Sequence, residues 1–241
     1  MTAEYSSPEF RARFADQARR AAERADLIIA VSEFTARQVS ELLGFDRSRI
    51  RVVPHGVRSN EQSRAREKFV LFVGALQIRK NVGRLVNAFE QLPPEWRLVL
   101  AGSPCGYGAG AIMKQISGSS CRERIEVTGF IAREALEQLY MKASIFAFPS
   151  LDEGFGIPVL EAMAHGTPLV TSNGSALVEV AGDAALLVNP EETDEIADAL
   201  RCLVQDSDLR NKLACLGRAR AKLYTWDRAV TETYRVYREV E

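Results

Sequence analysis

Two carboxylate side chains, those of Glu153 and Glu161, lie eight residues apart, with two glycines and a proline between them. The apolar run at residues 143–148 predicts a strand before them, and residues 159–165 predict a helix after the glycine-bearing loop. The first amides of a helix carry a partial positive charge, so such a strand–loop–helix can bind an anion such as a diphosphate. Glu161, one turn into the helix, can accept hydrogen bonds from vicinal hydroxyls, and Glu153 can reach a hydroxyl of a group attached to the diphosphate. A diphosphate between two diols is the chemistry of a sugar nucleotide.

The same residues permit simpler interpretations. Glycine-bearing loops between strands and helices are common in α/β proteins, and a glutamate near a helix start often only complements the helix dipole. Two carboxylates also form the acid and nucleophile pair of a glycosidase. Three hypotheses therefore stay open: transfer of a sugar from a nucleotide, binding of a nucleotide sugar without chemistry, and hydrolysis of a glycoside by Glu153 and Glu161.

Two adjacent cations, Arg79 and Lys80, form a second cluster. They follow an apolar run at residues 69–73 that ends at Gly74, and they precede a predicted helix at residues 81–91. Arginine binds phosphate through its planar fork and lysine binds it as a point charge, so the pair can neutralise a diphosphate. The alternative is that adjacent cations at a helix start are only solvated surface residues.

Strands and helices alternate along most of the chain, and this alternation must position both clusters. Repeated strand–helix units indicate an α/β fold, a Rossmann-like doubly wound parallel sheet with ligands at the carboxyl ends of its strands. A short βαβ unit precedes it, with strands at residues 27–31 and 50–53 around a helix at residues 32–43, and residues 59–68 predict a linker. The other predicted strands are at residues 69–73, 97–101, 125–128, 145–148, 168–172 and 185–188, and the other predicted helices are at residues 9–24, 81–91, 111–117, 133–142, 159–165, 176–181, 192–204, 208–224 and 227–239.

The composition argues against several classes of protein. The chain has 241 residues and a net charge of −1, so no broad field attracts nucleic acid. Its four cysteines are scattered, and the two histidines, His55 and His165, are expected to be structural; the sequence therefore predicts neither a metal site nor a cofactor. No run approaches the roughly 18 apolar residues of a membrane span, and the expected location is the cytoplasm.

Residues 149–168 resemble the E-x7-E signature of the retaining glycosyltransferases of family 4. The matching positions are Pro149-Ser150, Glu153-Gly154-Phe155-Gly156, Pro158, Leu160-Glu161-Ala162-Met163-Ala164 and Gly166-Thr167-Pro168. The resemblance implies the two-domain GT-B architecture, and it extends to the interdomain turn, the loop near the nucleobase and later landmarks at residues 52–57, 127–131, 179–185 and 225–226. It assigns residues 1–57 to a remnant of the N-terminal acceptor domain, residues 58–225 to the nucleotide-sugar-binding domain, and residues 226–241 to a C-terminal crossover helix.

The resemblance also implies an activity: transfer of a sugar, with mannose favoured, from a GDP- or UDP-linked donor to a glycan or lipid-linked acceptor. Catalytic roles fall to Glu153, Lys80 and Arg79, which position the donor sugar and stabilise the leaving diphosphate in place of a metal ion. One departure concerns Ala75, since many members have an arginine directly after the glycine, and here Arg79 has to supply the second cation. The implied donor contacts are Gly74, Arg79, Lys80, Phe130, Ile131, Glu153, Gly154, Phe155, Gly156, Ile157, Val159, Leu160 and Glu161.

Members of this family usually begin with a complete first domain, of which this sequence resembles only the last βαβ piece. The resemblance therefore favours self-association, or a partner chain, through the exposed faces of the helices at residues 9–24 and 227–239. The alternative function is a non-catalytic nucleotide-sugar-binding subunit that needs a partner chain supplying the missing domain. The expected setting is polysaccharide assembly, in the cytoplasm or peripheral at the inner face of the membrane.

Overall fold

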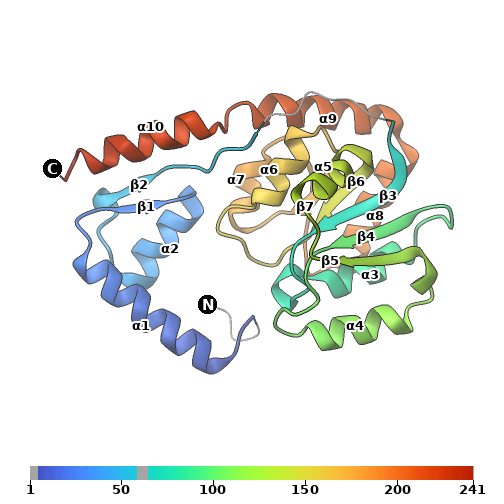
Figure 1. Cartoon of the computed structure of the whole chain (residues 1–241), viewed down its shortest axis with the longest axis horizontal. Coiled ribbons are helices and arrows are strands. Elements are labelled where there is room, and N and C mark those ends of the chain that lie inside the picture. The colour runs from blue at the N-terminus through green and yellow to red at the C-terminus, as the bar shows by residue number, and fades with distance from the viewer. Residues whose placement is uncertain (1–4, 59–64, 241) are drawn as a thin grey trace.

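The computed structural model describes residues 5–58 and 65–240, which form two units joined by two stretches of chain (Figure 1). The larger unit holds a six-stranded parallel sheet with helices on both faces, and the smaller holds a two-stranded parallel sheet. The predicted architecture, a doubly wound parallel sheet preceded by a short βαβ unit, is confirmed.

The large sheet has the strand order β5-β4-β3-β6-β7-β8, and every neighbouring pair is parallel. Its strands are β3 (Glu67–Val73), β4 (Arg97–Ala101), β5 (Ile125–Gly129), β6 (Ala143–Phe148), β7 (Leu169–Ser172) and β8 (Leu186–Val188). The chain builds outward from β3 to β5 and then returns to place β6 on the other side of β3. The order therefore reverses between β3 and β6, and ligands of such sheets bind outside the carboxyl ends of the strands at this switch point.

Near-continuous apolar runs form these strands, because a parallel sheet is covered on both faces. All of β6 is buried, and residues 69–72 of β3 are at most 2% exposed. Figure 1 shows α3 and α4 below the sheet and α5, α6 and α9 above it. The helices of this unit are α3 (Val82–Phe89), α4 (Ala109–Gly118), α5 (Arg133–Lys142), α6 (Ile157–Ala164), α7 (Ser175–Ala181), α8 (Thr193–Gln205) and α9 (Ser207–Ala221), with short 3-10 turns η2 (Ile78–Lys80) and η3 (Arg122–Arg124).

The smaller unit is the predicted βαβ piece, and the last helix of the chain lies along it. Its elements are α1 (Pro8–Arg24), β1 (Ile28–Ala30), α2 (Glu33–Leu43), the 3-10 turn η1 (Arg47–Arg49) and β2 (Ile50–Val52), and they are followed at the end of the chain by α10 (Trp226–Tyr237). Ala229 and Val236 of α10 pack with Val53 at the end of β2. The final helix therefore crosses back onto the first unit, while the domain boundaries at residues 57 and 225 stay a prediction.

The prediction of a linker at residues 59–68 is wrong for its last residues. Residues 59–64 lie outside the described part of the chain, but Glu67 and Lys68 open β3, and the Arg66 side chain enters the larger unit. Its guanidinium donates hydrogen bonds of 2.7–3.1 Å to the carbonyl oxygens of Tyr140, Ala143, His165 and Gly166 and to Oγ1 of Thr167. Burial and the charge of Arg218 lower the pKa of Arg66 to about 10. Arg66 thus satisfies carbonyl groups at the carboxyl ends of α5 and α6, where a cation also complements the helix dipoles.

The two stretches of chain between the units meet at one crossing point. The Val57 N–H donates to the carbonyl oxygen of Tyr224 at 2.9 Å. A Cβ atom on Gly56 would lie 2.2 Å from the backbone nitrogen of Trp226, so only a glycine permits this approach. The backbones of the two connections are therefore in direct contact where they pass between the units.

Candidate functional site

The loop between β6 and α6 presents a run of unpaired backbone donors. The chain enters the first turn of α6 through Gly156, whose φ of 102° is accessible to glycine and strained for other residues. Within the described part of the chain, the backbone N–H groups of residues 154–157 donate no hydrogen bond. Consecutive free N–H groups at a helix start make a concave surface of positive potential. The loop therefore has the geometry of an anion site.

Glu153, Arg79 and Lys80 come together beside this loop. Nζ of Lys80 lies 2.6 Å and Nη1 of Arg79 lies 2.8 Å from Oε1 of Glu153, and the Ser150 hydroxyl donates to the same oxygen at 2.7 Å. The Lys80 side chain is only 11% exposed, and its Nζ lies 4.6 Å from the ring centroid of Phe148. The two cations that the sequence assigns to a diphosphate thus contact a carboxylate of the chain itself.

Burial and pairing act in opposite directions on the charges of this cluster. Burial lowers the pKa of Lys80, although the charge of Glu153 and its hydrogen bond raise it again in part. Burial works to raise the pKa of Glu153, but Lys80, Arg79 and the hydrogen bonds hold it below its ordinary value. Burial also raises the pKa of the neighbouring Asp152. Glu153 is therefore an ionised acceptor at neutral pH and not a proton donor.

Glu161 lies on α6 and contacts α5. The Tyr140 hydroxyl donates to Oε2 of Glu161 at 2.9 Å, and the Tyr140 ring stacks on His165 with centroids 5.3 Å apart. Burial raises the pKa of Glu161, and the hydrogen bond from Tyr140 opposes this. One carboxylate oxygen is therefore already engaged, whereas the sequence suggested that Glu161 can meet a pair of hydroxyls. Sequence reasoning missed Tyr140, because apolar spacing marks it only as a core residue of its helix.

Three cavities formed by the described residues each hold some of the predicted site residues. Their volumes are about 560, 630 and 270 Å³. The first is lined by Ile157 and Glu161, the second by Arg79, Glu153 and Gly154, and the third, at the ends of β3, β4 and β5, by Gly74, Phe130 and Ile131. Glu153 and Glu161 line different cavities, so they do not flank one bond from two sides as a glycosidase pair does.

Three of the predicted donor contacts turn their side chains into the core. Phe155 is 5% exposed, and Val159 and Leu160 are fully buried. The N–H groups of Val159 and Leu160 donate to the carbonyl oxygen of Gly156 at 3.0 and 3.3 Å. These three side chains form the core-facing side of the loop and helix, so only the backbone of these residues can face a ligand, and their assignment to the donor site stays a prediction. Phe155 keeps only its backbone N–H for a ligand.

The smaller unit also contacts the signature loop. The hydroxyls of Ser32 and Thr35 donate to the carbonyl oxygen of Gly154 at 2.7 and 2.9 Å. The His55 ring packs edge-on against Phe155 with centroids 5.2 Å apart, and burial lowers the pKa of His55. Packing of this kind agrees with the structural role expected of His55. Sequence reasoning missed Ser32 and Thr35 at the site, since a hydroxyl at a helix start indicates only a cap.

The described residues include no group of three or more His, Cys, Asp or Glu side chains that could hold a metal ion. None of the helices in residues 5–58 and 65–240 is long and apolar enough to cross a membrane.

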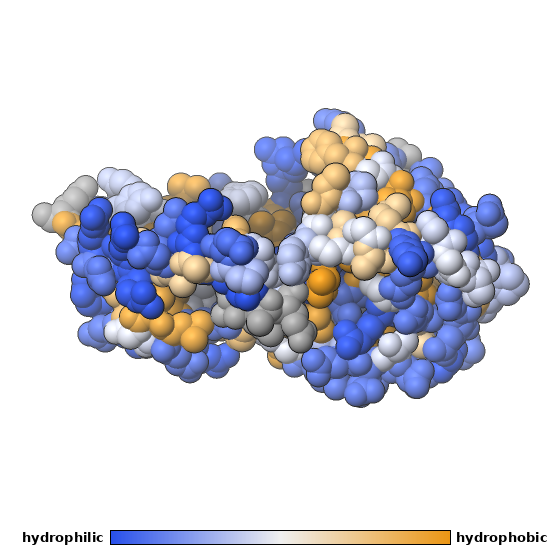
Figure 2. Space-filling view, turned by 90° about the horizontal axis from the view of Figure 1, so that it is seen from below, coloured by the Kyte–Doolittle hydropathy of each residue, from blue (hydrophilic) through white to orange (hydrophobic). Residues whose placement is uncertain are grey.

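On the face that Figure 2 shows, hydrophilic residues cover most of both units, and apolar residues gather in smaller patches.

Models of known families match both units. The model for "Glycosyl transferases group 1" matches residues 57–220, and the model for "Glycosyltransferase Family 4" matches residues 2–61. The first match covers the whole signature and both predicted clusters.

Relatives match nearly the whole chain. The O-antigen chain mannosyltransferase B of Escherichia coli is 31% identical over 232 residues, which cover 89% of this chain and 61% of that protein. Sucrose-phosphate synthase from Thermosynechococcus elongatus superposes with a TM-score of 0.85 at 25% identity and covers 98% of this chain and 64% of that one. Anabaena HepE, solved in complex with UDP-glucose, superposes with a TM-score of 0.83 at 22% identity, over 97% of this chain and 69% of that one. The chain thus spans about three fifths of the length of its curated relative.

Proposed function

The chain belongs to the glycosyltransferases of group 1 and family 4, and we propose that it forms the donor-binding portion of a retaining transferase. The proposed reaction moves a sugar from a nucleotide diphosphate to a hydroxyl of a glycan or lipid-linked acceptor. The observation that carries this proposal is that N–H groups at the start of α6, which have no partner in the described chain, lie beside the half-buried Arg79 and the buried Lys80. A diphosphate can leave from such a site without a metal ion, since preorganised donors stabilise its charge.

We propose that the nucleotide extends across two of the cavities. The base occupies the cavity beside Phe130 and Ile131, and the ribose hydroxyls meet the carboxylate of Glu161. Leu136 lines both cavities, which supports one ligand reaching from the first into the second. Phe130 is 90% exposed, so its ring is available to stack on a base. The diphosphate then lies at residues 154–157.

The sugar that we propose is mannose, carried by GDP. A 31% identical relative is named as a mannosyltransferase of O-antigen chains, which favours this sugar. HepE, in contrast, was solved with UDP-glucose, so a UDP-linked donor is the alternative. The affinities of the chain for GDP and for UDP therefore have to be compared.

In the proposed mechanism, the diphosphate replaces Glu153 as the partner of Lys80 and Arg79. Glu153, thus freed, accepts a hydrogen bond from a hydroxyl of the donor sugar and fixes its orientation. The bond between sugar C1 and the diphosphate oxygen breaks, and its electron pair stays with the diphosphate, where the two cations and the N–H groups neutralise it. The acceptor oxygen forms the new bond to C1, and its proton passes to the leaving diphosphate.

A second candidate is a subunit that binds a nucleotide sugar without chemistry of its own. The smaller unit favours this candidate, because its sheet has two strands in the part of the chain that the structure describes. An isolated pair of strands is marginal as a scaffold, and a partner chain that extends it would complete the acceptor side of the cleft.

Titration calorimetry in the presence of a chelator tests the donor site. We expect GDP or UDP to bind the chain, and Lys80→Ala to lose affinity for both, while exposed Lys68→Ala keeps it. If neither nucleotide binds at millimolar concentration to a chain that circular dichroism shows to be folded, the donor site is wrongly assigned. Binding of GDP-mannose without transfer to any mannoside favours the second candidate.

A further inference from the structure

We propose that the cavity between α1 and the signature loop is an acceptor subsite, and that it takes the terminal sugar of a neutral glycan. This inference rests on the proposed function, since the cavity shares Glu153 and Arg79 with the donor site. The proposed function leaves the acceptor site open, whereas the residues of this cavity indicate which side chains select the acceptor and which kind of acceptor they bind.

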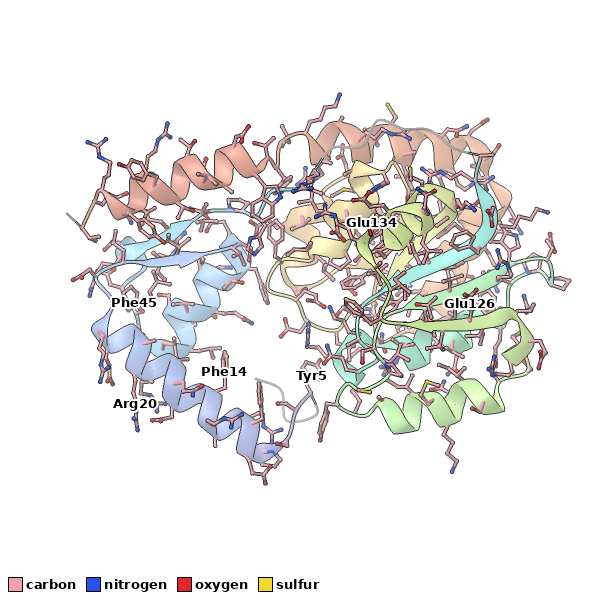
Figure 3. The ribbon with its side chains drawn as sticks, in the orientation of Figure 1. Tyr5, Phe14, Arg20, Phe45, Glu126 and Glu134 are labelled. Atoms are coloured by element: carbon pink, nitrogen blue, oxygen red, sulfur yellow. The ribbon has the colours of Figure 1, made fainter. Side chains whose placement is uncertain are left out.

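The cavity has two chemically different walls. The wall on the larger unit carries the ionic groups of Arg79, Asp152 and Glu153. The rest of the lining carries no charged side chain: the smaller unit contributes Tyr5, Ser6, Ser7, Phe10 and Gln38, and the larger unit contributes Gln77, Tyr107 and Gly154. Figure 3 shows Tyr5 in the space between α1 and the larger unit, where the two walls face each other. A ligand held here lies directly beside the group that orients the donor sugar.

Aromatic rings and amides together suit a sugar better than a purely apolar or purely charged ligand. Phe10 is 44% and Tyr107 is 45% exposed, so both rings keep free surface against which the C–H face of a pyranose can stack. Among the residues that the structure describes, the side chains of Gln38 and Gln77 make no hydrogen bond. The hydroxyl of Ser6 is buried and likewise has no partner in the described chain. These groups can donate to and accept from sugar hydroxyls.

The charges that line the cavity argue against a phosphate or another anion as its occupant. Arg79 is its one lining cation among the described residues, and it already pairs with Glu153 and donates to the carbonyl oxygen of Asp152. Two carboxylates face the same space and would repel an anion. A neutral saccharide meets no such penalty.

The aromatic surface continues beyond the cavity. Phe14 stacks on Phe10 with ring centroids 6.1 Å apart and is 47% exposed, one turn further along α1. In Figure 3 Phe14 and Arg20 leave α1 on opposite sides, with Phe14 toward the inside of the molecule. A glycan of more than one sugar can therefore extend from the cavity along this face of the helix.

Ligand-observed NMR with methyl α-mannoside, on the full chain saturated with GDP, tests the subsite. We expect binding in the millimolar range and a five- to tenfold loss, roughly one stacking contact, in Phe10→Ala and in Tyr107→Ala. The matched control is Tyr237→Ala, which removes an exposed aromatic ring from α10, outside the cavity, and should leave the affinity for the glycoside unchanged.

A GDP titration of the same samples separates this inference from the proposed function. Failure of both GDP and UDP to bind refutes the donor site, whereas nucleotide binding without glycoside binding overturns only the acceptor subsite. If Phe10→Ala and Tyr107→Ala weaken GDP-mannose but not the glycoside, the cavity holds the donor's sugar and the inference is wrong. The two variants lie on different elements, so a folding defect in one leaves the other as the test.

Discussion

One carboxylate oxygen of Glu153 accepts hydrogen bonds from Lys80 and Ser150 and also forms an ion pair with Arg79. A diphosphate that binds at residues 154–157 must therefore take Arg79 and Lys80 from a partner they already have. Neither cation is left without an anionic partner, because one anion replaces another. The sequence marks these three residues as neighbours of a diphosphate, but their pairing depends on distances across β3 and β6 that spacing along the chain does not contain. Likewise, no motif predicts that Tyr140 occupies one oxygen of Glu161.

Replacing the two carboxylates one at a time should separate their roles. Glu161→Gln should weaken GDP binding by about 1.5–3 kcal/mol, or ten- to hundredfold, because the ribose hydroxyls lose a charged acceptor. Glu153→Gln should leave GDP binding unchanged or tighter, since Lys80 and Arg79 are freed, and should weaken the intact GDP-mannose. Calorimetry with both ligands measures this, with exposed Glu126→Gln as the control. Equal losses for both ligands in both variants would contradict the division of roles.

At the level of elements, the strand–helix alternation was predictable and the linker was not. All the predicted strands and helices from residue 69 onward occur, with ends that shift by a few residues; α6, for example, begins at Ile157 rather than at Val159 because Pro158 is accommodated inside its first turn. Arg66 shows what the composition of a segment cannot predict. A polar, charged segment predicts a solvated linker, yet a guanidinium at its end can satisfy the carbonyl groups of two helix ends, and only the tertiary structure brings those ends together.

Removing the Arg66 guanidinium should destabilise the larger unit. Arg66→Leu leaves several carbonyl oxygens without a donor, so we expect a loss of about 2–4 kcal/mol and a fall in Tm of about 5–15 °C. Thermal unfolding followed by circular dichroism measures it. Arg97→Leu, which removes an exposed arginine paired with Glu67, should cost at most about 1 kcal/mol. Equal Tm values for the two variants would mean that Arg66 is only a surface residue.

At the scale of the whole molecule, α10 carries an exposed apolar surface beside the two-stranded sheet. Val230, Tyr234 and Tyr237 are 65, 61 and 59% exposed, and all three line an apolar cavity of about 350 Å³ beside β1 and β2. A net charge of −1 offers little repulsion between copies. The surface is therefore suited to contact with a second polypeptide.

A polypeptide of these 241 residues should accordingly self-associate as its concentration rises. Light scattering over a concentration series measures the average mass. Val230→Glu together with Tyr237→Glu should shift the series toward the monomer, whereas Leu42→Glu, a change at an exposed apolar residue of α2, should not. A monodisperse monomer at every concentration would rule out this role for α10.

The contact between Val57 and Tyr224 has a mechanical consequence. Because both connections touch at one place, the two units share a single pivot, and relative motion becomes rotation rather than sliding. α10 starts at this pivot and runs along the smaller unit for 12 residues, about 18 Å at 1.5 Å per residue, so it acts as a lever arm. A tilt of about 10° that pulls Ser32 and Thr35 from the Gly154 carbonyl would swing the far end of α10 by about 3 Å. Opening of the cleft at the Gly154 carbonyl would thus appear as a displacement of the far end of α10, which grows with distance from the pivot.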